Sequence, residues 1–328
     1  MKLSVATRRA ARILAIAAML PAVAGAQGYP SKPITMYVAY GAGATTDITA
    51  RALAKAAEAV LGVPIAIENK GGGGGTLAAG LLASKKPDGY TLLVGSTGPL
   101  TIRPLLLKVS YNPANITGII EYSHFHNGSV VVNANSPWKT IDEFIAYAKQ
   151  HPGMSYATAG AGGVPTGSQQ QGVVALMQCK GLQFKHVPTK GGTEANTMLM
   201  GNHVDFTSGS GSHNPLVVEG VFRQLVVFEK TRDPNFPDTP TLRDIGCDWD
   251  NPPDSGMAIF APKGLPPDVS RKLEQTFTAI VKSDDFQAML KRNYLPFDFK
   301  DSKQLAADIK GELDWFTDYF RKTGDLKN

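Results

Sequence analysis

The feature that most constrains the fold is a strand that ends on a glycine-rich loop and continues into a helix, because it occurs twice. Residues 34–40 form an apolar, β-branched and aromatic run before a Gly-Ala-Gly sequence, and residues 47–60 then repeat apolar side chains at helical spacing. Residues 154–157, the glycine-rich residues 159–163 and a helical pattern from Thr166 repeat this order. Strands that alternate with helices are typical of a doubly wound parallel sheet, so we expect an α/β fold with two such units.

The length of the chain also favours two domains. The 328 residues, 43% of them hydrophobic, exceed what one core usually holds. Residues 29–128 contain the first unit, and the second includes a helix that begins with a predicted capping box of Thr140 and Glu143. A stretch rich in proline and aspartate at 233–254 precedes three helical patterns between 269 and 320. We expect these last helices to return to the first domain.

The N-terminus has the pattern of a secretory signal peptide over residues 1–26. Basic residues precede the apolar run 13–20, and Ala24-x-Ala26 offers a peptidase site, so the mature chain would begin at Gln27. The run is about half the length of a membrane span, which disfavours a retained anchor. The Arg8-Arg9 pair leaves twin-arginine export as an alternative to the general route. We expect the product in the periplasm.

The net charge excludes nucleic acid as a partner. The chain has 33 basic and 28 acidic residues, but the leader holds four of the basic residues and no acid, which leaves 29 against 28. No later run of basic residues suggests a nucleic acid or lipid surface. The high isoelectric point is therefore mostly a property of the leader.

The chain has two cysteines, Cys179 and Cys247, and this number limits the zinc sites and disulfides that it can form. They are too few for a cysteine-rich zinc site and allow at most one disulfide. The sequence leaves open whether they form that bridge or remain two separate buried thiols.

The glycine-rich loops point to an anion site. A loop between a strand and a helix presents unpaired backbone N–H groups at the positive end of the helix dipole, which favours a bound anion. Ligands of open α/β sheets lie at the carboxyl ends of the strands. The loops at 40–47, 96–98 and 159–166 would then line one crevice between the domains, although each loop taken alone is equally well explained as a turn.

The sequence supports an enzyme active site or a metal site less well than it supports an anion site. Gly41-x-Gly43 and Glu68 follow strands as in a dinucleotide fingerprint, but the third glycine of that motif would fall at Thr46. No G-x-S-x-G nucleophile elbow is present, and His213 reads as a rim histidine rather than a general base. His124-x-His126 lacks a third ligand for a metal. We therefore expect no catalytic residue, no metal and no cofactor.

A series of short motifs resembles one family, the substrate-binding proteins of tripartite tricarboxylate transporters, also known as the Bordetella uptake group. Each motif is weak alone, and together they are specific and extend from Tyr29 to Gly324. They are Tyr29-Pro30-x-Lys32-Pro33-Ile34, Asp47, Glu68-Asn69-x-Gly71, Pro87-Asp88-Gly89-Tyr90-Thr91-Leu92-Leu93, Gly95-Ser96-Thr97, Tyr156-Ala157-Thr158-Ala159-Gly160-x-Gly162, His186-Val187-Pro188-x-Lys190-Gly191, Gly201-x-x-Val204-Asp205, Pro237-Asp238-x-Pro240-Thr241 and Phe260-Ala261-Pro262.

The resemblance implies a type II periplasmic binding protein fold, with two doubly wound α/β domains joined by a two-strand hinge. Domain 1 would be discontinuous, with residues 29–130 and 255–328, and domain 2 would cover 131–254. The crossings would lie near 129–133 and 255–261. Members of this family hold a ligand carboxylate with backbone amides, hydroxyls and water, without an arginine clamp, and deliver it to a membrane permease with one large and one small subunit.

Departures from the family pattern bear on the ligand. Residues 41–46 replace the usual Pro-Pro-Gly-Gly loop, while Thr189 stands for a tyrosine and Thr166 for a histidine. Residues 208–210 replace a Phe-Asp-Asn sequence, and loss of that acid argues against an α-amino acid. Smaller side chains widen the cleft. A larger dicarboxylate is the leading hypothesis, including an aromatic one stacked near Tyr40, Phe125 or His126.

These observations predict a monomeric solute-binding receptor that closes by hinge motion around a small carboxylate and performs no chemistry on it. Alternatives from other classes are a co-receptor for a sensor kinase and a periplasmic enzyme that uses the same cleft. Asp47 has a second interpretation, as the cap of its own helix. The residues expected to bind ligand are Tyr40, Gly43, Ala44, Thr45, Thr46, Asp47, Ser96, Thr97, Ala159, Gly160, Gly163, Thr166, Thr189 and Ser208.

Overall fold

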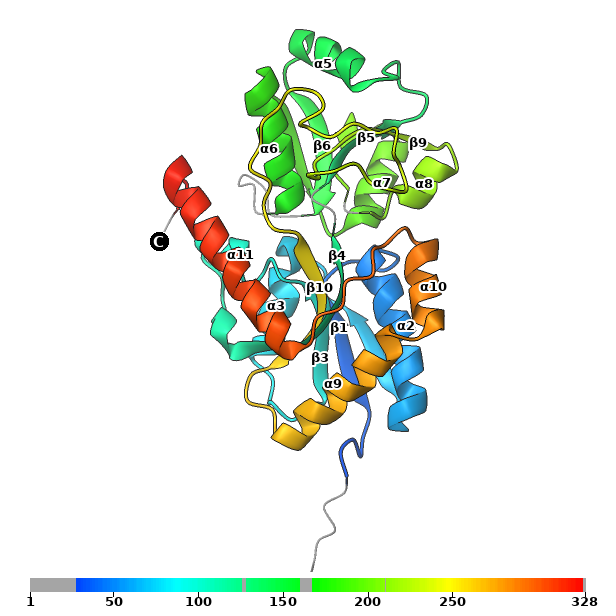
Figure 1. Ribbon diagram of the computed structural model, residues 1–328, viewed down its shortest axis with the longest axis vertical. Coiled ribbons are helices and arrows are strands. Elements are labelled where there is room, and N and C mark those ends of the chain that lie inside the picture. The colour runs from blue at the N-terminus through cyan, green and yellow to red at the C-terminus, as the bar shows by residue number, and fades with distance from the viewer. Residues whose placement is uncertain (1–27, 126–127, 160–166, 210, 327–328) are drawn as a thin grey trace, which may run out of the picture.

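The computed structural model describes residues 28–125, 128–159, 167–209 and 211–326, which form two lobes, each built on a five-stranded sheet (Figure 1). The first sheet has the strand order β2 (Ile65–Asn69), β1 (Ile34–Val38), β3 (Thr91–Ser96), β10 (Ser255–Pro262) and β4 (Ile116–Phe125). The second sheet has the order β7 (Phe184–Thr189), β6 (Met154–Ala159), β8 (Phe206–Thr207), β5 (Ser129–Asn133) and β9 (Phe222–Val227). The expected α/β architecture with two units is confirmed.

Helices cover both lobes. The first lobe carries α2 (Thr45–Leu61), α3 (Thr76–Ala83), α4 (Ile102–Leu106), α9 (Pro267–Val281), α10 (Asp284–Arg292) and α11 (Ser302–Thr323), with short 3₁₀ turns η1 (Gly73–Gly75) and η2 (Pro113–Asn115). The second lobe carries α5 (Ile141–Gln150), α6 (Ser168–Lys180), α7 (Gly192–Met200) and α8 (Asn214–Val218). The helices after β10 return to the first lobe, where α9 packs on α2 and α11 on β4. Figure 1 shows α11 running along the side of that lobe toward the second one.

Local sequence signals explain where several helices begin and end. The capping box predicted for α5 is present, because the Thr140 side chain accepts from the Glu143 N–H and the Glu143 carboxylate accepts in return. Asp301 and Gln304 form the same motif at the start of α11. Helix α2 ends at Gly62, whose φ of 72° is a left-handed conformation that glycine adopts without a Cβ penalty.

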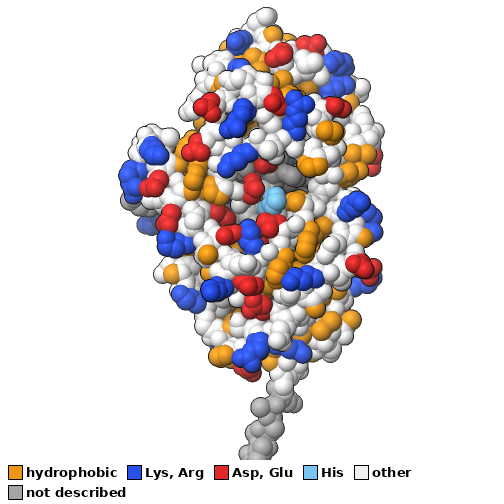
Figure 2. Space-filling model, in the orientation of Figure 1, with side chains coloured by type: hydrophobic (Ala, Val, Ile, Leu, Met, Phe, Trp, Pro, Cys, Tyr) orange, Lys and Arg blue, Asp and Glu red, His pale blue; other side chains and the backbone are white. Residues whose placement is uncertain are grey.

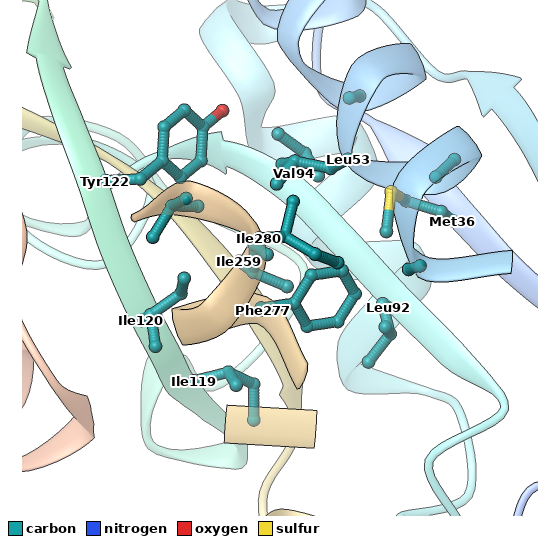
Figure 3. Close-up of a cluster of buried hydrophobic side chains, with 14 of the residues drawn as sticks. Met36, Leu53, Leu92, Val94, Ile119, Ile120, Tyr122, Ile259, Phe277 and Ile280 are labelled. Carbon is teal, nitrogen blue, oxygen red and sulfur yellow. The ribbon is translucent and has the colours of Figure 1, made fainter. Parts of the chain in front are cut away.

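The core of the first lobe joins segments that are far apart in the sequence. Met36 of β1, Leu92 and Val94 of β3, and Ile259 of β10 are all 0% exposed and lie against α9. Figure 3 shows the Phe277 ring of α9 among these side chains. Burial of each such side chain stabilises the fold by about 1.5–3 kcal/mol. The C-terminal helix α9 therefore belongs to the same core as the N-terminal strands β1 and β3.

The expected parallel sheet is only partly correct, because both sheets are mixed: in the second lobe β5 is antiparallel to β8 and β9, and the first lobe also contains an antiparallel strand. Strand β1 runs parallel to β2 and β3, but β10 lies between β3 and β4 and is antiparallel to both. Strand β4 was not predicted, because its sequence contains Gly118, Glu121 and His124. Two register irregularities against β10 and the close packing of Leu305 on Gly118 accommodate this sequence.

The two cysteines form a disulfide in the second lobe and are not separate buried thiols. Cys179 lies in the last turn of α6, and Cys247 lies in the long connection from β9 to β10. Cys247 is 2% exposed and packs with the second core. The bridge therefore fastens the connection between the two sheets to a helix of the second lobe.

Candidate ligand-binding cleft

A cleft of about 810 Å³, part of it open to solvent, lies between the two sheets and is lined from both lobes. Seven of the predicted binding residues line it: Tyr40, Ala44, Thr45, Thr46, Ser96, Ala159 and Ser208. Four others, Gly43, Asp47, Thr97 and Thr189, are not among its lining residues, and Gly160, Gly163 and Thr166 lie outside the described residues. The strand-end loops of both lobes thus meet at one cleft, as the sequence predicts.

The first-lobe wall combines a helix N-terminus with hydroxyl groups. Ala44 is the N-cap residue of α2, no side chain caps this end, and Ala44, Thr45 and Thr46 all line the cleft. The Tyr40 hydroxyl is 2.8 Å from the Ser96 hydroxyl oxygen, and its ring lies edge-on to Phe125 at 6.0 Å. This wall offers donors to an anion and an aromatic surface to an apolar ligand.

Asp47 neither caps its helix nor lines the cleft. Its carboxylate accepts from the Gly43 N–H at 2.9 Å, from Asn69 at 2.8 Å and from Arg51 at 3.0 Å. Burial acts to raise the pKa of Asp47, but the hydrogen bonds to Arg51, Gly43 and Asn69 outweigh it and hold the pKa below its ordinary value. Asp47 therefore fixes the loop that presents the α2 N-terminus, and the cap interpretation was wrong.

The second-lobe wall is built from small residues. Ser208 follows β8, and its hydroxyl donates to the Gln169 carbonyl at 3.1 Å. Thr189 is 6% exposed and donates to the Gly191 carbonyl, so it shapes the next loop from behind. A Cβ at Gly191 would lie 3.4 Å from the Gly41 nitrogen of the other lobe. The lobes therefore touch at this loop.

The charged residues of the cleft were missed by sequence reasoning. Arg103 of α4 and Glu312 of α11 both line it and are each 5% exposed. The Glu312 carboxyl makes side-chain hydrogen bonds with Thr97 and Thr101, and burial raises its pKa to about 8. Thr97 thus supports the cleft from behind. No local pattern marks these residues, since tertiary packing alone brings α4 and α11 to the strand ends.

Because Glu312 is largely neutral at pH 7, the described lining residues carry a net positive charge. Arg103 is the basic residue among them and Glu312 the acidic one. Burial lowers the pKa of Arg103, yet a guanidinium stays protonated at physiological pH. This electrostatic balance favours an anionic ligand.

The buried acids predict a pH dependence of stability. Burial raises the pKa of Glu121 to about 7 and that of Glu312 to about 8, against Lys300, which lowers both. The folded state then binds these protons more tightly than the unfolded chain, so their contribution is full below about pH 4.5 and is lost as pH rises through 7 and 8. We expect the free energy of unfolding to fall across this range, and to fall less in Glu312→Gln. Urea denaturation at pH 5, 7 and 9 measures both slopes; equal slopes would contradict the assignment.

A second, more open cavity of about 1650 Å³ lies between segment 229–235 and α10. Figure 2 shows the hollow between the lobes on this face, with acidic, basic and histidine side chains around it. His124 lies here, 3.5 Å from Asp298 and 4.0 Å from Asp254. Across the described residues, no group of three or more side chains is placed to hold a metal ion. Nor does any described helix combine the length and apolar character that crossing a membrane requires.

Comparison with known proteins identifies the family. The model of the "Tripartite tricarboxylate transporter family receptor" matches residues 49–321. The chain is similar to the "UPF0065 protein in gbd 5'region" of Cupriavidus necator, at 35% identity over 89% of this chain and 88% of that protein.

Solved structures agree. The periplasmic binding protein BugD is 27% identical with a TM-score of 0.83 over 92% of this chain and all of that one. MatC from Rhodopseudomonas palustris, solved with bound malate, is 26% identical with a TM-score of 0.79, over 88% of this chain and 99% of that one. These are periplasmic binding proteins and not enzymes. The family resemblance is thereby confirmed, and the chain belongs to the tripartite tricarboxylate transporter receptor family.

Proposed function

We propose that this protein captures a small dicarboxylate in the cleft between its lobes and delivers it to the permease of a tripartite tricarboxylate transporter. The observation that carries the proposal is the composition of the cleft: the open N-terminus of α2, several hydroxyls and a net positive charge. Backbone N–H groups at a helix N-terminus suit a carboxylate. The malate bound in MatC supports the same ligand class.

Closure would couple binding to delivery. In this proposal residues 29–130 with 255–328 move as one body and residues 131–254 as another, about the two connections between the sheets. The contact of Gly191 with the loop at Gly41 supports a closed arrangement in which both lobes touch the ligand. A ligand that contacts both lobes stabilises the closed state by the contacts that the open state lacks. The closed monomer is then the form that the large and small permease subunits recognise.

Export is part of the proposal. Residues 1–26 would be removed as a signal peptide, and the mature chain from Gln27 would act in the periplasm, where the transporter family collects its solutes. The N-terminal sequence of the protein recovered from a periplasmic fraction tests this directly.

The proposed function is tested by ligand screening. The mature protein, freed of bound ligand by unfolding and refolding, is heated with aliphatic and aromatic mono-, di- and tricarboxylates. A ligand at 100 times its Kd stabilises the folded state by about 2.7 kcal/mol. We expect saturable stabilisation by dicarboxylates, with the ligand recovered unchanged. Silence across all carboxylates would overturn the proposal, and conversion of the ligand would favour an enzyme.

Thr46 provides a residue-level prediction. It is 1% exposed and lies in the first turn of α2 at the cleft. Thr46→Val keeps the shape of the side chain but removes the hydroxyl, so we expect the dicarboxylate to bind about 1–3 kcal/mol more weakly. Isothermal titration calorimetry measures the change. Thr278→Val, on α9 and not at the cleft, serves as the matched control; equal affinities of the two variants would remove Thr46 from the site.

A further inference from the structure

Arg103 is the basic side chain of the described cleft wall, and it is placed where water has little access. It is 5% exposed and belongs to α4, just after the loop that follows β3. Glu312, the acid of the same wall, makes its hydrogen bonds with Thr97 and Thr101. Among the described lining residues, the Arg103 guanidinium is therefore the charged group that attracts an anion.

The glycine-rich turn η1 makes room for the guanidinium. Gly74 has φ of 62°, a left-handed conformation, and a Cβ at this position would overlap the Arg103 guanidinium. The sequence alone predicts a loop over residues 71–75. In the structure this run is the surface on which the Arg103 side chain rests, so the position of the charge is fixed by the fold.

Arg103 also reaches the boundary between the lobes. A Cβ at Gly167, the N-cap residue of α6 in the second lobe, would lie 3.4 Å from the Arg103 guanidinium. The side chain thus extends from the first lobe to the second at the cleft. A ligand group that binds Arg103 would be held at the place where the lobes come together.

We propose that Arg103 binds one carboxylate of a dicarboxylate whose other carboxylate lies at the N-terminus of α2, and so selects diacids over monoacids. The inference rests on the proposed function and assigns a residue to its specificity. An arginine fork binds a carboxylate through two parallel hydrogen bonds, which a half-amide cannot replace. This is a departure from the pattern implied by the family resemblance, in which no arginine holds the ligand.

The test compares diacids with their half-amides. Succinate, adipate and benzene-1,4-dicarboxylate, each with its monoamide, are titrated into wild type and Arg103→Gln by calorimetry. We expect the diacid that binds wild type most tightly to lose about 10- to 150-fold in affinity, the range for a hydrogen bond to a charged group. The matching half-amide should lose less affinity, because its amide end offers the guanidinium one neutral oxygen instead of the two charged oxygens of a carboxylate. Selectivity for the diacid then disappears.

Controls separate binding from folding. Arg271→Gln removes a charge from an exposed position on α9 and should leave both affinities unchanged. If Arg103→Gln does not fold, Arg103→Lys keeps the charge without the fork and should still reduce the preference for the diacid. Equal losses for diacid and half-amide, or no loss, would overturn the role of Arg103 while diacid binding by wild type stands. Failure of wild type to bind any carboxylate would instead overturn the proposed function.

Discussion

Phe206→Ala is expected to destabilise the protein by about 3–5 kcal/mol, the range for removing a large aromatic side chain from a core. Phe206 is 0% exposed, and its ring centroid lies 4.8 Å from that of Phe184, 5.2 Å from Tyr156 and 5.3 Å from Phe144. Each of these aromatic pairs adds to the area buried. The loss falls on the second lobe, because all four rings belong to its core.

Urea denaturation followed by circular dichroism and tryptophan fluorescence measures this effect. Trp138 and Trp249 pack with the core of the second lobe and Trp315 lies on α11 of the first, so the emission reports on both lobes. Phe297→Ala is the matched control, since Phe297 is 41% exposed and surface substitutions usually change stability by less than about 0.5 kcal/mol. A similar stability of the two variants would show that the aromatic cluster does not organise this lobe.

Loss of the disulfide is the second large effect. The bridge joins Cys179 and Cys247 across a sequence separation of 68 residues and restricts the unfolded chain. Replacement of both cysteines by alanine should reduce the free energy of unfolding by about 2–4 kcal/mol. The connection that carries Cys247 also contributes Pro253 to the cleft, so we expect ligand affinity to fall as well.

Treatment with a reductant separates the effect of breaking the disulfide from the effect of replacing the two cysteine side chains. Dithiothreitol should lower the stability of the wild-type protein and leave that of the double alanine variant unchanged. If the wild-type protein were indifferent to the reductant while thiol labelling showed both cysteines free, the bridge would contribute nothing to stability.

Much of the architecture can be predicted from local sequence, because hydrophobic periodicity and the positions of glycines in turns depend only on residues that are close together in the chain. The strand-loop-helix units and the capping box of Thr140 and Glu143 are of this kind. Strand β4 is not predictable in this way, since Glu121 in its middle forms an ion pair at 2.7 Å with Lys300, which is far away in the chain. A buried acid in a strand has no signal that a sequence window can read.

The residues of the cleft also fall into those that the sequence could predict and those that it could not. Tyr40, Ser96 and Ser208 could be predicted because they follow strands of the two sheets, and the ends of parallel strands lie at one edge. Arg103 and Glu312 are 209 positions apart and reach the cleft through the packing of α11 on α4. Asp47 was placed at the right loop, but its role depends on Asn69 and Arg51, partners that only the folded chain reveals.

The position of β10 sets the order in which the lobes can be completed as the chain is made. Strands β3 and β4 have no direct pairing and are joined through β10, which begins at Ser255. The strands of the second lobe, from Ser129 to Val227, are all made before it. A nascent chain can therefore finish the second sheet first, while the first sheet keeps a gap between two unpaired strand edges. Unpaired strand edges are the surfaces from which misassembly starts, so the C-terminal segment that begins at Ser255 protects the strands of the first lobe.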